Sequence, residues 1–297
     1  MKKMLLFVNP AAGREEIPSH LMEIISRFTA AGYDVLCHPT QKPQDVTEVI
    51  AATGSQYDMI VTCGGDGTLN ETITGLMQLK ERPPLGYIPA GTVNDFATSL
   101  HIPKTIPEAV TNIIEGVPFP VDMGGFNEKY FTYVAAFGAF TKVSYATPHA
   151  SKQALGRAAY ILEGIRSLTD IRPIHVTVDA KEAHIEDDVI LGMVTNATSV
   201  GGFKALDDSI VKMDDGLNEI ILVRAPKNLA DYNAIVASLI TRDFKPDHFH
   251  IFQTDSVTME FNTPVPWTLD GEFGGETDRA VVTNIPTPLR IMVPSKN

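Results

Sequence analysis

The chain has 297 residues, a length typical of two domains or one large one, and its 44% hydrophobic and 20% charged residues are an ordinary globular composition. This composition excludes bulk disorder. The 36 acidic residues outnumber the 24 Lys and Arg, and the resulting formal charge of -12 repels nucleic acid and anionic membranes. We therefore expect no nucleic-acid partner, and membrane contact would need a local surface patch.

Between residue 4 and about residue 122, short apolar runs alternate with segments of helical period. The predicted strands are residues 5–8, 34–36, 59–62 and 85–88. Amphipathic helices are predicted between these strands. One has apolar residues at positions 21, 24, 25 and 28 and ends at Gly32. Another has apolar residues at positions 46, 49 and 50 and ends at Gly54. Strands that alternate with helices indicate βαβ units and hence a parallel sheet.

After residue 122 the pattern changes to strands joined by short polar turns, such as 175–179 and 184–194 with the turn 180–182. Helices are predicted at 153–168 and 228–241. This half is therefore expected to be mostly antiparallel β-structure. The stretch 122–126 is the predicted domain boundary, and the apolar run 289–293 fits either domain by its pattern.

The N-terminal apolar run, residues 4–8, ends at Asn9-Pro10 and is too short for a signal peptide. No apolar run approaches the roughly 18 residues that span a bilayer. Cys37 and Cys63 fit a reducing compartment, and we assign them no chemistry. The expectation is a cytoplasmic protein that associates with membranes only transiently.

The sequence GGDGTLNE occupies residues 64–71, after the apolar run 59–63 and at the start of a helical pattern. Glycines allow a sharp turn and close approach to a ligand, and N–H groups at a helix start bind anions such as phosphate. Thr68 offers a hydroxyl contact, whereas the Asp66 carboxylate implies an intervening Mg²⁺ or polarised water. A tight strand-to-helix turn capped by Asp or Thr is an equally good interpretation of these residues alone.

Two further turns follow predicted strands: NPAAG at residues 9–13 and PAGTVNDFA at residues 89–97. The carboxyl ends of strands in an open α/β sheet converge on the crevice where ligands bind, so three such turns together favour a nucleotide site. The spacing matches neither the dinucleotide pattern G-x-G-x-x-G nor the P-loop, which needs G-K-[ST].

The chain contains three motifs in this order: GGDGTLNE, PAGTVNDFA, and LDGE at residues 269–272. They resemble the motifs of the diacylglycerol kinase catalytic domain family, specifically those of the soluble bacterial lipid kinases. GGDGT by itself is shared with NAD kinases and, more loosely, phosphofructokinases, so the combination carries the resemblance, which covers essentially the whole chain. It implies an α/β N-terminal nucleotide-binding domain, residues 1–125, of the NAD kinase and diacylglycerol kinase type. A C-terminal, mostly antiparallel β-sandwich domain for the lipid would follow at residues 126–285. Residues 286–297 would return to the first domain, and the catalytic cleft would lie between the two domains.

The reaction implied by the resemblance is ATP- and Mg²⁺-dependent transfer of the γ-phosphoryl group to a lipid hydroxyl, with diacylglycerol to phosphatidic acid as the leading case. Glu272 would be the general base for the lipid hydroxyl, and Asp66 would organise Mg²⁺ and phosphate. Without the family, a plain Asp-Gly hairpin turn is the favoured interpretation of the residues before Glu272. The residues expected to line ATP are Asn9, Pro10, Ala11, Ala12, Gly13, Thr40, Gly64, Gly65, Asp66, Gly67, Thr68, Leu69, Asn70 and Thr92.

Residues 213–217, MDDGL, resemble the family's second metal site. The resemblance implies a structural Mg²⁺ bound by the Asp215 carboxylate and the carbonyls of Lys212 and Leu217, which are oxygen ligands that Mg²⁺ accepts. A simple Asp-Asp-Gly turn between strands is the alternative. The supporting cleft network would consist of Asn94, Asp95 and Asp122.

One position departs from the family pattern. Many members carry Arg three residues after the Asp of the NDF motif, where this chain has Thr98. The charge partner of Asp95 is therefore open, with Arg14, Lys152 and Arg157 as candidates.

Two other functions remain compatible with the sequence: NAD kinase, and a non-catalytic nucleotide-sensing protein of the same fold. The second and third motifs weigh against the former, and the presence of Asp66 and Glu272 weighs against the latter. The acceptor stays open among diacylglycerol, phosphatidylglycerol, undecaprenol-like and sphingoid lipids. The expected partner is a lipid substrate at a membrane surface, reached by peripheral contact, and a homodimer is left open.

Two smaller features have ordinary explanations. His248 and His250 flank Phe249 on a predicted strand, but two imidazoles without a third ligand indicate surface histidines rather than a zinc site. The apolar residues 244, 249, 251 and 252 are interpreted as packed β core, with an exposed membrane-docking patch as the alternative.

Overall fold

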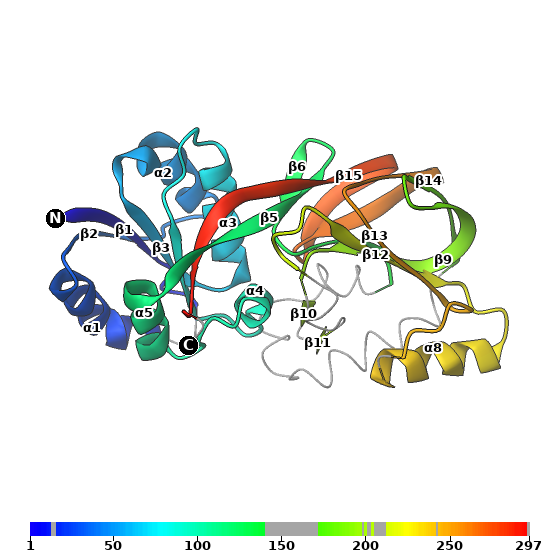
Figure 1. The fold of residues 1–297 in the computed structure, drawn as a ribbon, viewed down its shortest axis with the longest axis horizontal. Helices are drawn as coiled ribbons and strands as arrows, with labels where there is room; N and C mark the ends of the chain where they lie inside the picture. The colour runs from blue at the N-terminus through cyan, green and yellow to red at the C-terminus, as the bar shows by residue number, and fades with distance from the viewer. Residues whose placement is uncertain are drawn as a thin grey trace. The chain divides into compact units, whose positions relative to one another are not determined.

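The computed structural model describes residues 1–12, 16–139, 172–197, 199–200, 203–204, 212–241 and 243–295. The chain forms two compact units, Met1–Asp122 with Thr287–Asn297, and Met123–Pro286. It passes from one unit to the other within two strands, β5 (Val117–Phe126) and β15 (Glu272–Val293) (Figure 1). The predicted helix 153–168 lies outside the described residues.

The first unit alternates strands and helices, as its sequence predicts. Its elements besides the ends of β5 and β15 are β1 (Lys2–Val8), α1 (Glu16–Ala30), β2 (Tyr33–Pro39), α2 (Asp45–Thr53), the 3₁₀ turn η2 (Gly54–Gln56), β3 (Met59–Gly64), α3 (Asp66–Met77), β4 (Leu85–Pro89), α4 (Asp95–Ser99) and α5 (Ile106–Glu115). The strands form a parallel sheet in the order β15-β4-β3-β1-β2, which confirms the predicted βαβ arrangement.

The parallel sheet of the first unit is buried on both faces by helices, as parallel sheets require. On one face, α1 and α5 pack on alternate residues of β1 and β3, and Arg27 of α1 donates hydrogen bonds to the Pro107 carbonyl and the Thr111 hydroxyl of α5, at 2.7 and 2.6 Å. Helices α2 and α3 pack against each other (Figure 1). This three-layer packing fixes the carboxyl ends of β1, β3 and β4 at one edge.

The second unit is mostly strands. Its elements besides β5 and β15 are β6 (Lys129–Phe131), β7 (Val134–Gly138), β8 (Ile174–Ala180), β9 (His184–Thr195), β10 (Ser199–Val200), β11 (Phe203–Lys204), β12 (Asn218–Arg224), α8 (Leu229–Thr241), β13 (Phe249–Thr254) and β14 (Ser256–Leu269). The pairing of β8 with β9 is antiparallel and joined by a short turn, as predicted. The predicted second helix is α8.

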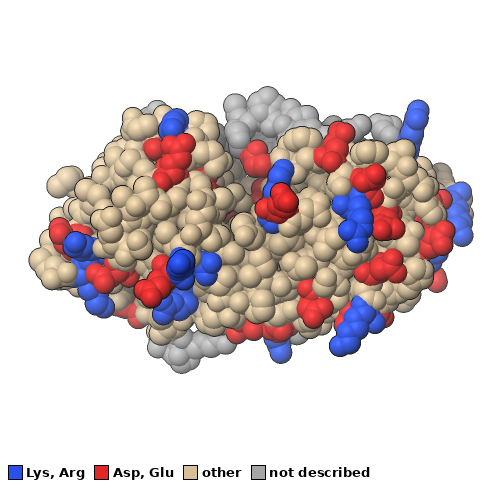
Figure 2. Space-filling model, turned by 90° about the horizontal axis from the view of Figure 1, so that it is seen from above, with Lys and Arg blue, Asp and Glu red and all other residues tan. Residues whose placement is uncertain are grey.

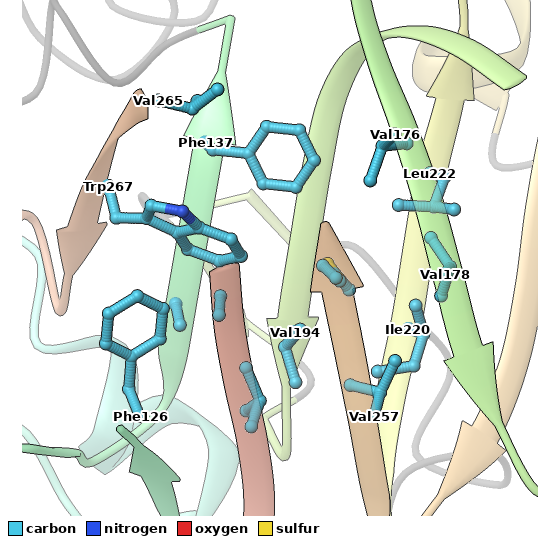
Figure 3. Packing of buried hydrophobic residues seen from close by; sticks show 14 of the residues in the cluster. Phe126, Phe137, Val176, Val178, Val194, Ile220, Leu222, Val257, Val265 and Trp267 are labelled. Carbon is cyan, nitrogen blue, oxygen red and sulfur yellow. The ribbon is translucent and has the colours of Figure 1, made fainter. Parts of the chain in front are cut away.

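The strands of the second unit close on themselves. Both β7 and β8 pair with β9 on one side and with β14 on the other, so the ladder returns to its start. Inside, the Trp267 indole packs between Phe126 and Phe137, with ring centroids 4.8 and 4.7 Å away (Figure 3). Such aromatic packing gives this unit a core of its own, separate from that of the α/β unit. Among the described helices, none combines the length and apolar character needed to cross a membrane.

Candidate functional site

The three glycine-containing turns of the sequence meet at the carboxyl edge of the parallel sheet. The amide of Asn9, just after β1, donates to the Cys63 carbonyl at 3.0 Å, and Thr40, just after β2, donates to the Val8 carbonyl at 2.9 Å. The amide of Ala90, after β4, donates to the Gly64 carbonyl at 2.8 Å. Backbone hydrogen bonds therefore hold the ends of β1, β2, β3 and β4 side by side, and the predicted ATP residues follow them.

Asn9 joins the first turn to the start of α3. Its Nδ2 donates to Thr68 Oγ1 at 2.9 Å, while its Oδ1 accepts from the amide of Ala11 at 3.0 Å. Thr68 is 8% exposed, so its hydroxyl faces the Asn9 turn rather than open solvent. The side chain of Asn9 thus shapes the loop that the family motifs assign to the nucleotide. Gly13 lies outside the described residues.

The GGDGT turn and the PAGTVND turn approach each other through their glycines. A Cβ on Gly91 would lie 2.7 Å from the Cα of Gly65, and a Cβ on Gly65 would lie 3.2 Å from the Cα of Gly91. Real Cβ atoms do not come within 3.0 Å of a backbone carbon, so Gly91 is required by the space available. By contrast, a Cβ on Gly67, in the first turn of α3, would meet nothing within 4 Å.

Asn94 connects these two turns to Asp66. Its backbone φ is 55°, in the left-handed region that Asn tolerates better than most residues, and its amide donates to Asp66 Oδ2 at 2.9 Å. Its side-chain Oδ1 accepts from the amide of Gly91 at 2.9 Å and from the Tyr87 hydroxyl at 3.3 Å. The Asp66 carboxylate is therefore fixed in orientation by the neighbouring turn.

Tyr87 belongs to this network and is missing from the sequence prediction. It is fully buried in β4, and burial, followed by the negative charges of Asp66 and Asp95, raises its pKa well above the usual value. Its hydroxyl thus stays protonated as a donor to Asn94. The only sequence signal is a tyrosine in an otherwise apolar strand directly before PAGTVND.

The remaining predicted residues of the first unit differ in exposure. The side chain of Leu69 is buried, with 1% of the residue exposed, whereas Thr92 is exposed. Asp95 is buried at the start of α4. Asp122 is fully buried in β5, and its Oδ1 accepts from the amide of Thr287 at 2.6 Å, where β15 re-enters the unit.

Lys104 brings a positive charge to Thr98, the position that departs from the family pattern. Its Nζ donates to Thr98 Oγ1 at 2.7 Å, and that hydroxyl donates to the Asn94 carbonyl at 3.0 Å. The sequence gives no signal for Lys104, because it lies six residues further along the chain and carries no motif. The candidates Arg14, Lys152 and Arg157 lie outside the described residues.

Glu272 is the first residue of β15, and its backbone pairs with Leu269 across a two-residue turn. The turn residues Asp270 and Gly271 have φ of 51° and 86°, as in the hairpin turns that favour Asp-Gly. Glu272 is exposed, so its carboxylate is accessible to a ligand. The neighbouring aromatic ring of Phe273 is 55% exposed.

The predicted metal residues form a surface turn before β12. Asp215 is exposed, and its Oδ1 accepts from the amide of Leu217 at 3.1 Å. The Leu217 carbonyl accepts from Asn284 Nδ2 at 3.0 Å, which leaves its second lone pair for another ligand. A carboxylate and carbonyls on an exposed turn fit the oxygen donors that Mg²⁺ requires. Among the described residues, no group of three or more His, Cys, Asp or Glu side chains could hold a metal.

Glu219 is a buried carboxyl group near this turn. It is 0% exposed, and its Oε1 accepts from Gln253 Nε2 at 3.0 Å. Burial is the main cause that raises its pKa from 4.5 to about 7; the hydrogen bond from Gln253 opposes this rise, and the charge of Asp215 adds to it. Glu219 therefore holds a proton in the folded protein at pH values where an exposed glutamate has lost it.

Stability of the metal-free protein should consequently fall as the pH rises from about 4.5 to about 7. In this window the folded state keeps the Glu219 proton that the unfolded chain releases, so unfolding is favoured by about 2–3 kcal/mol at the upper end. Glu219→Gln removes the ionisation and should flatten this part of the profile. The free energy of unfolding at each pH is measured by urea unfolding, with the fluorescence of the single tryptophan as the signal. This tryptophan lies in the core of the same unit. A variant profile as steep as that of the wild type would contradict the prediction.

The smaller features agree with their ordinary explanations. His250 Nε2 lies 2.9 Å from Asp187 Oδ2, and the same oxygen lies 2.8 Å from Arg224 Nε. Phe249 is buried, Phe244 packs against it edge to face at 5.1 Å, and Phe252 packs on the core of the second unit. These rings are core, as interpreted, although Ile251 is 37% exposed.

Cys37 and Cys63 are free thiols, and burial raises the pKa of Cys63 to about 12.

The chain thus combines an α/β unit, whose parallel strands are followed by glycine-containing turns, with a second unit made mostly of antiparallel strands. Residues 3–126 match the diacylglycerol kinase catalytic domain family, and residues 134–293 match the YegS C-terminal NAD kinase beta sandwich-like domain. The chain belongs to the diacylglycerol kinase family, a family of lipid kinases, and both units have the expected fold.

Similar proteins match this chain over most of their length. A diacylglycerol kinase of Bacillus subtilis is 36% identical over 280 residues, which are 93% of this chain and 91% of the relative. One of Staphylococcus saprophyticus is 34% identical over 278 residues, 93% of this chain and 90% of the relative. A crystal structure of a diacylglycerol kinase from Bacillus anthracis has a TM-score of 0.80 at 25% identity and covers 98% of this chain and 97% of that one.

Proposed function

We propose that this protein is an ATP- and Mg²⁺-dependent lipid kinase that transfers the γ-phosphoryl group to the hydroxyl of diacylglycerol and forms phosphatidic acid. The observation that carries the proposal is the junction of the GGDGT and PAGTVND turns, held by the Gly65–Gly91 approach and by the Asn94–Asp66 hydrogen bond. The relatives named as diacylglycerol kinases support the choice of acceptor.

The start of α3 supplies the phosphate-binding groups in this proposal. The first N–H groups of a helix have no partner within the helix and carry the positive end of its dipole, so they bind the phosphates of ATP. Gly67 is exposed there, and the space beside its Cα is open, which lets phosphate oxygens approach the backbone. Asn9 and Thr40 lie at the neighbouring strand ends and would contact the remainder of the nucleotide.

Asp66 would hold Mg²⁺ against the phosphates. Its carboxylate is oriented by Asn94 and its negative charge repels phosphate, so a cation between them is the arrangement that stabilises both. Bound Mg²⁺ would neutralise charge that develops on the transferred group. Asp215, with the carbonyls of Lys212 and Leu217, would bind a second, structural Mg²⁺.

Glu272 would act as the general base. Its exposed carboxylate accepts the proton of the lipid hydroxyl while the oxygen attacks the γ-phosphorus, the bond from that phosphorus to the β,γ-bridging oxygen breaks, and ADP leaves. The rigid hairpin turn before Glu272 limits the positions that the carboxylate can take. The protein would meet its substrate by peripheral contact with a membrane from the cytoplasm.

The net charge of -12 gives the protein little electrostatic attraction to polyanions. Figure 2 shows acidic and basic side chains interspersed over the described part of one face, in keeping with the net charge of -12. A nucleic-acid partner would require a continuous basic surface for its phosphates. This pattern supports a lipid rather than a polynucleotide as the proposed partner.

Phosphate transfer from labelled Mg-ATP tests the proposal directly. The purified protein is offered diacylglycerol in mixed micelles, and phosphatidylglycerol, sphingosine and NAD in parallel. We expect labelled phosphatidic acid, lost when EDTA is added. Labelled NADP would instead establish the NAD kinase alternative, and ATP binding without transfer to any acceptor would favour a nucleotide sensor.

A further inference from the structure

Asp270 has an unusual set of contacts for a turn residue. Its Oδ2 accepts a hydrogen bond from the amide of Thr132 at 2.6 Å, and its Oδ1 accepts from the amides of Tyr133 and Val134 at 2.9 and 3.1 Å. These donors are the two residues between β6 and β7 and the first residue of β7, about 137 residues away in sequence. The side chain therefore ties the β14–β15 turn to a different region of the second unit.

The backbone of Asp270 reinforces this link. Its amide donates to the Val134 carbonyl at 2.8 Å, and its carbonyl accepts from the Tyr133 hydroxyl at 3.2 Å. Charge-assisted hydrogen bonds from backbone amides to a carboxylate are stronger and shorter than neutral ones. A simple Asp-Gly hairpin turn needs none of these contacts, because its own two residues provide the geometry. The contacts thus tie the turn to the segment 132–134 by five hydrogen bonds.

We infer that Asp270 is a positioning residue for phosphoryl transfer, because it fixes the turn from which the proposed base Glu272 projects. Glu272 follows two residues later and is itself exposed, so the turn is what determines where its carboxylate lies. A misplacement of about 1 Å at a reacting group costs up to about 100-fold in rate. The inference rests on the proposed function, since it assumes that Glu272 takes the proton of the acceptor hydroxyl.

Asp270→Asn tests this role with little risk to the fold. Asn adopts the left-handed conformation readily and keeps one side-chain carbonyl, but its Nδ2 faces the Thr132 amide as a second donor. We expect kcat with diacylglycerol to fall about 10- to 100-fold, while the KM for ATP stays close to wild type and Trp267 fluorescence shows a folded protein at the assay temperature. Asp278→Asn, an exposed position on the same strand, is the matched control.

A double-mutant cycle separates positioning from a general structural role. If Asp270 acts through Glu272, then Asp270→Asn adds no further loss of kcat in a Glu272→Gln background, because the base that it positions is already gone. Multiplied losses in the double variant would overturn the inference, as would wild-type kcat in Asp270→Asn while Glu272→Gln is slow. Wild-type turnover in Glu272→Gln would instead refute the assignment of the base in the proposed function, and the inference with it.

Discussion

Glu272→Gln should bind Mg-ATP as tightly as the wild type and turn over about 10²–10⁴ times more slowly, which is the usual effect of removing a general base. Gln is close to Glu in size and keeps one oxygen, so the hairpin remains intact. It cannot accept a proton from the lipid hydroxyl at neutral pH. Single-turnover phosphate transfer to diacylglycerol, with ATP affinity measured in parallel, checks this expectation.

The matched control for this variant is Glu276→Gln. Glu276 is exposed on the same strand and pairs across the ladder with Pro266, so the change removes an equal charge without touching the turn. We expect wild-type kcat from the control. Near-normal turnover in Glu272→Gln would remove this residue from the mechanism, and equal losses in both variants would point to a general effect of surface charge.

Gly91→Ala should weaken ATP binding at least about tenfold and lower the free energy of unfolding by about 1–3 kcal/mol, as overpacking does. The new methyl group would lie 2.7 Å from the Cα of Gly65 and 2.7 Å from Asn94 Oδ1. Because a backbone atom cannot rotate away as a side chain can, the two turns must separate. The separation breaks the Asn94 contact that orients Asp66. Isothermal titration with Mg-ATP and urea unfolding measure the two effects.

Gly67→Ala provides the comparison for Gly91→Ala. Its Cβ meets nothing within 4 Å of the protein, and Ala is favoured over Gly in a helix by about 1 kcal/mol, so stability should stay level or rise. If phosphates approach the backbone at Gly67, the same methyl group weakens ATP binding although the fold is intact. Loss of stability in Gly67→Ala would contradict the open space beside its Cα. Unchanged ATP affinity in both variants would show that this turn does not have the proposed role.

The repeating elements of the first unit follow from local sequence. Strands β1, β3 and β4 are apolar at nearly every position because both faces of a parallel sheet are covered, and this produces short runs that are visible without a structure. Helix α1 presents its apolar residues at helical spacing and ends near Gly32. Periodicity and stop signals are properties of neighbouring residues, so they can be read from the chain.

The candidate site was only partly accessible in this way. The motifs identify Asp66, Asn94 and Glu272, because glycine-rich turns have a recognisable composition. They do not identify Tyr87 or Lys104, whose roles depend on contacts to Asn94 and Thr98 that the fold creates. They also assign Leu69 to the nucleotide, and only the structure shows that its side chain is buried in α3.

By itself the sequence determined the alternation of strands and helices, the three motifs and, through them, the kinase family. Tertiary structure decided how those motifs are supported: that Gly91 must lack a side chain because Gly65 lies against it, and that Asp270 binds backbone amides about 137 residues away. The physical reason is that composition and period act over a few residues, whereas steric space and hydrogen-bond partners arise only when distant segments are folded together.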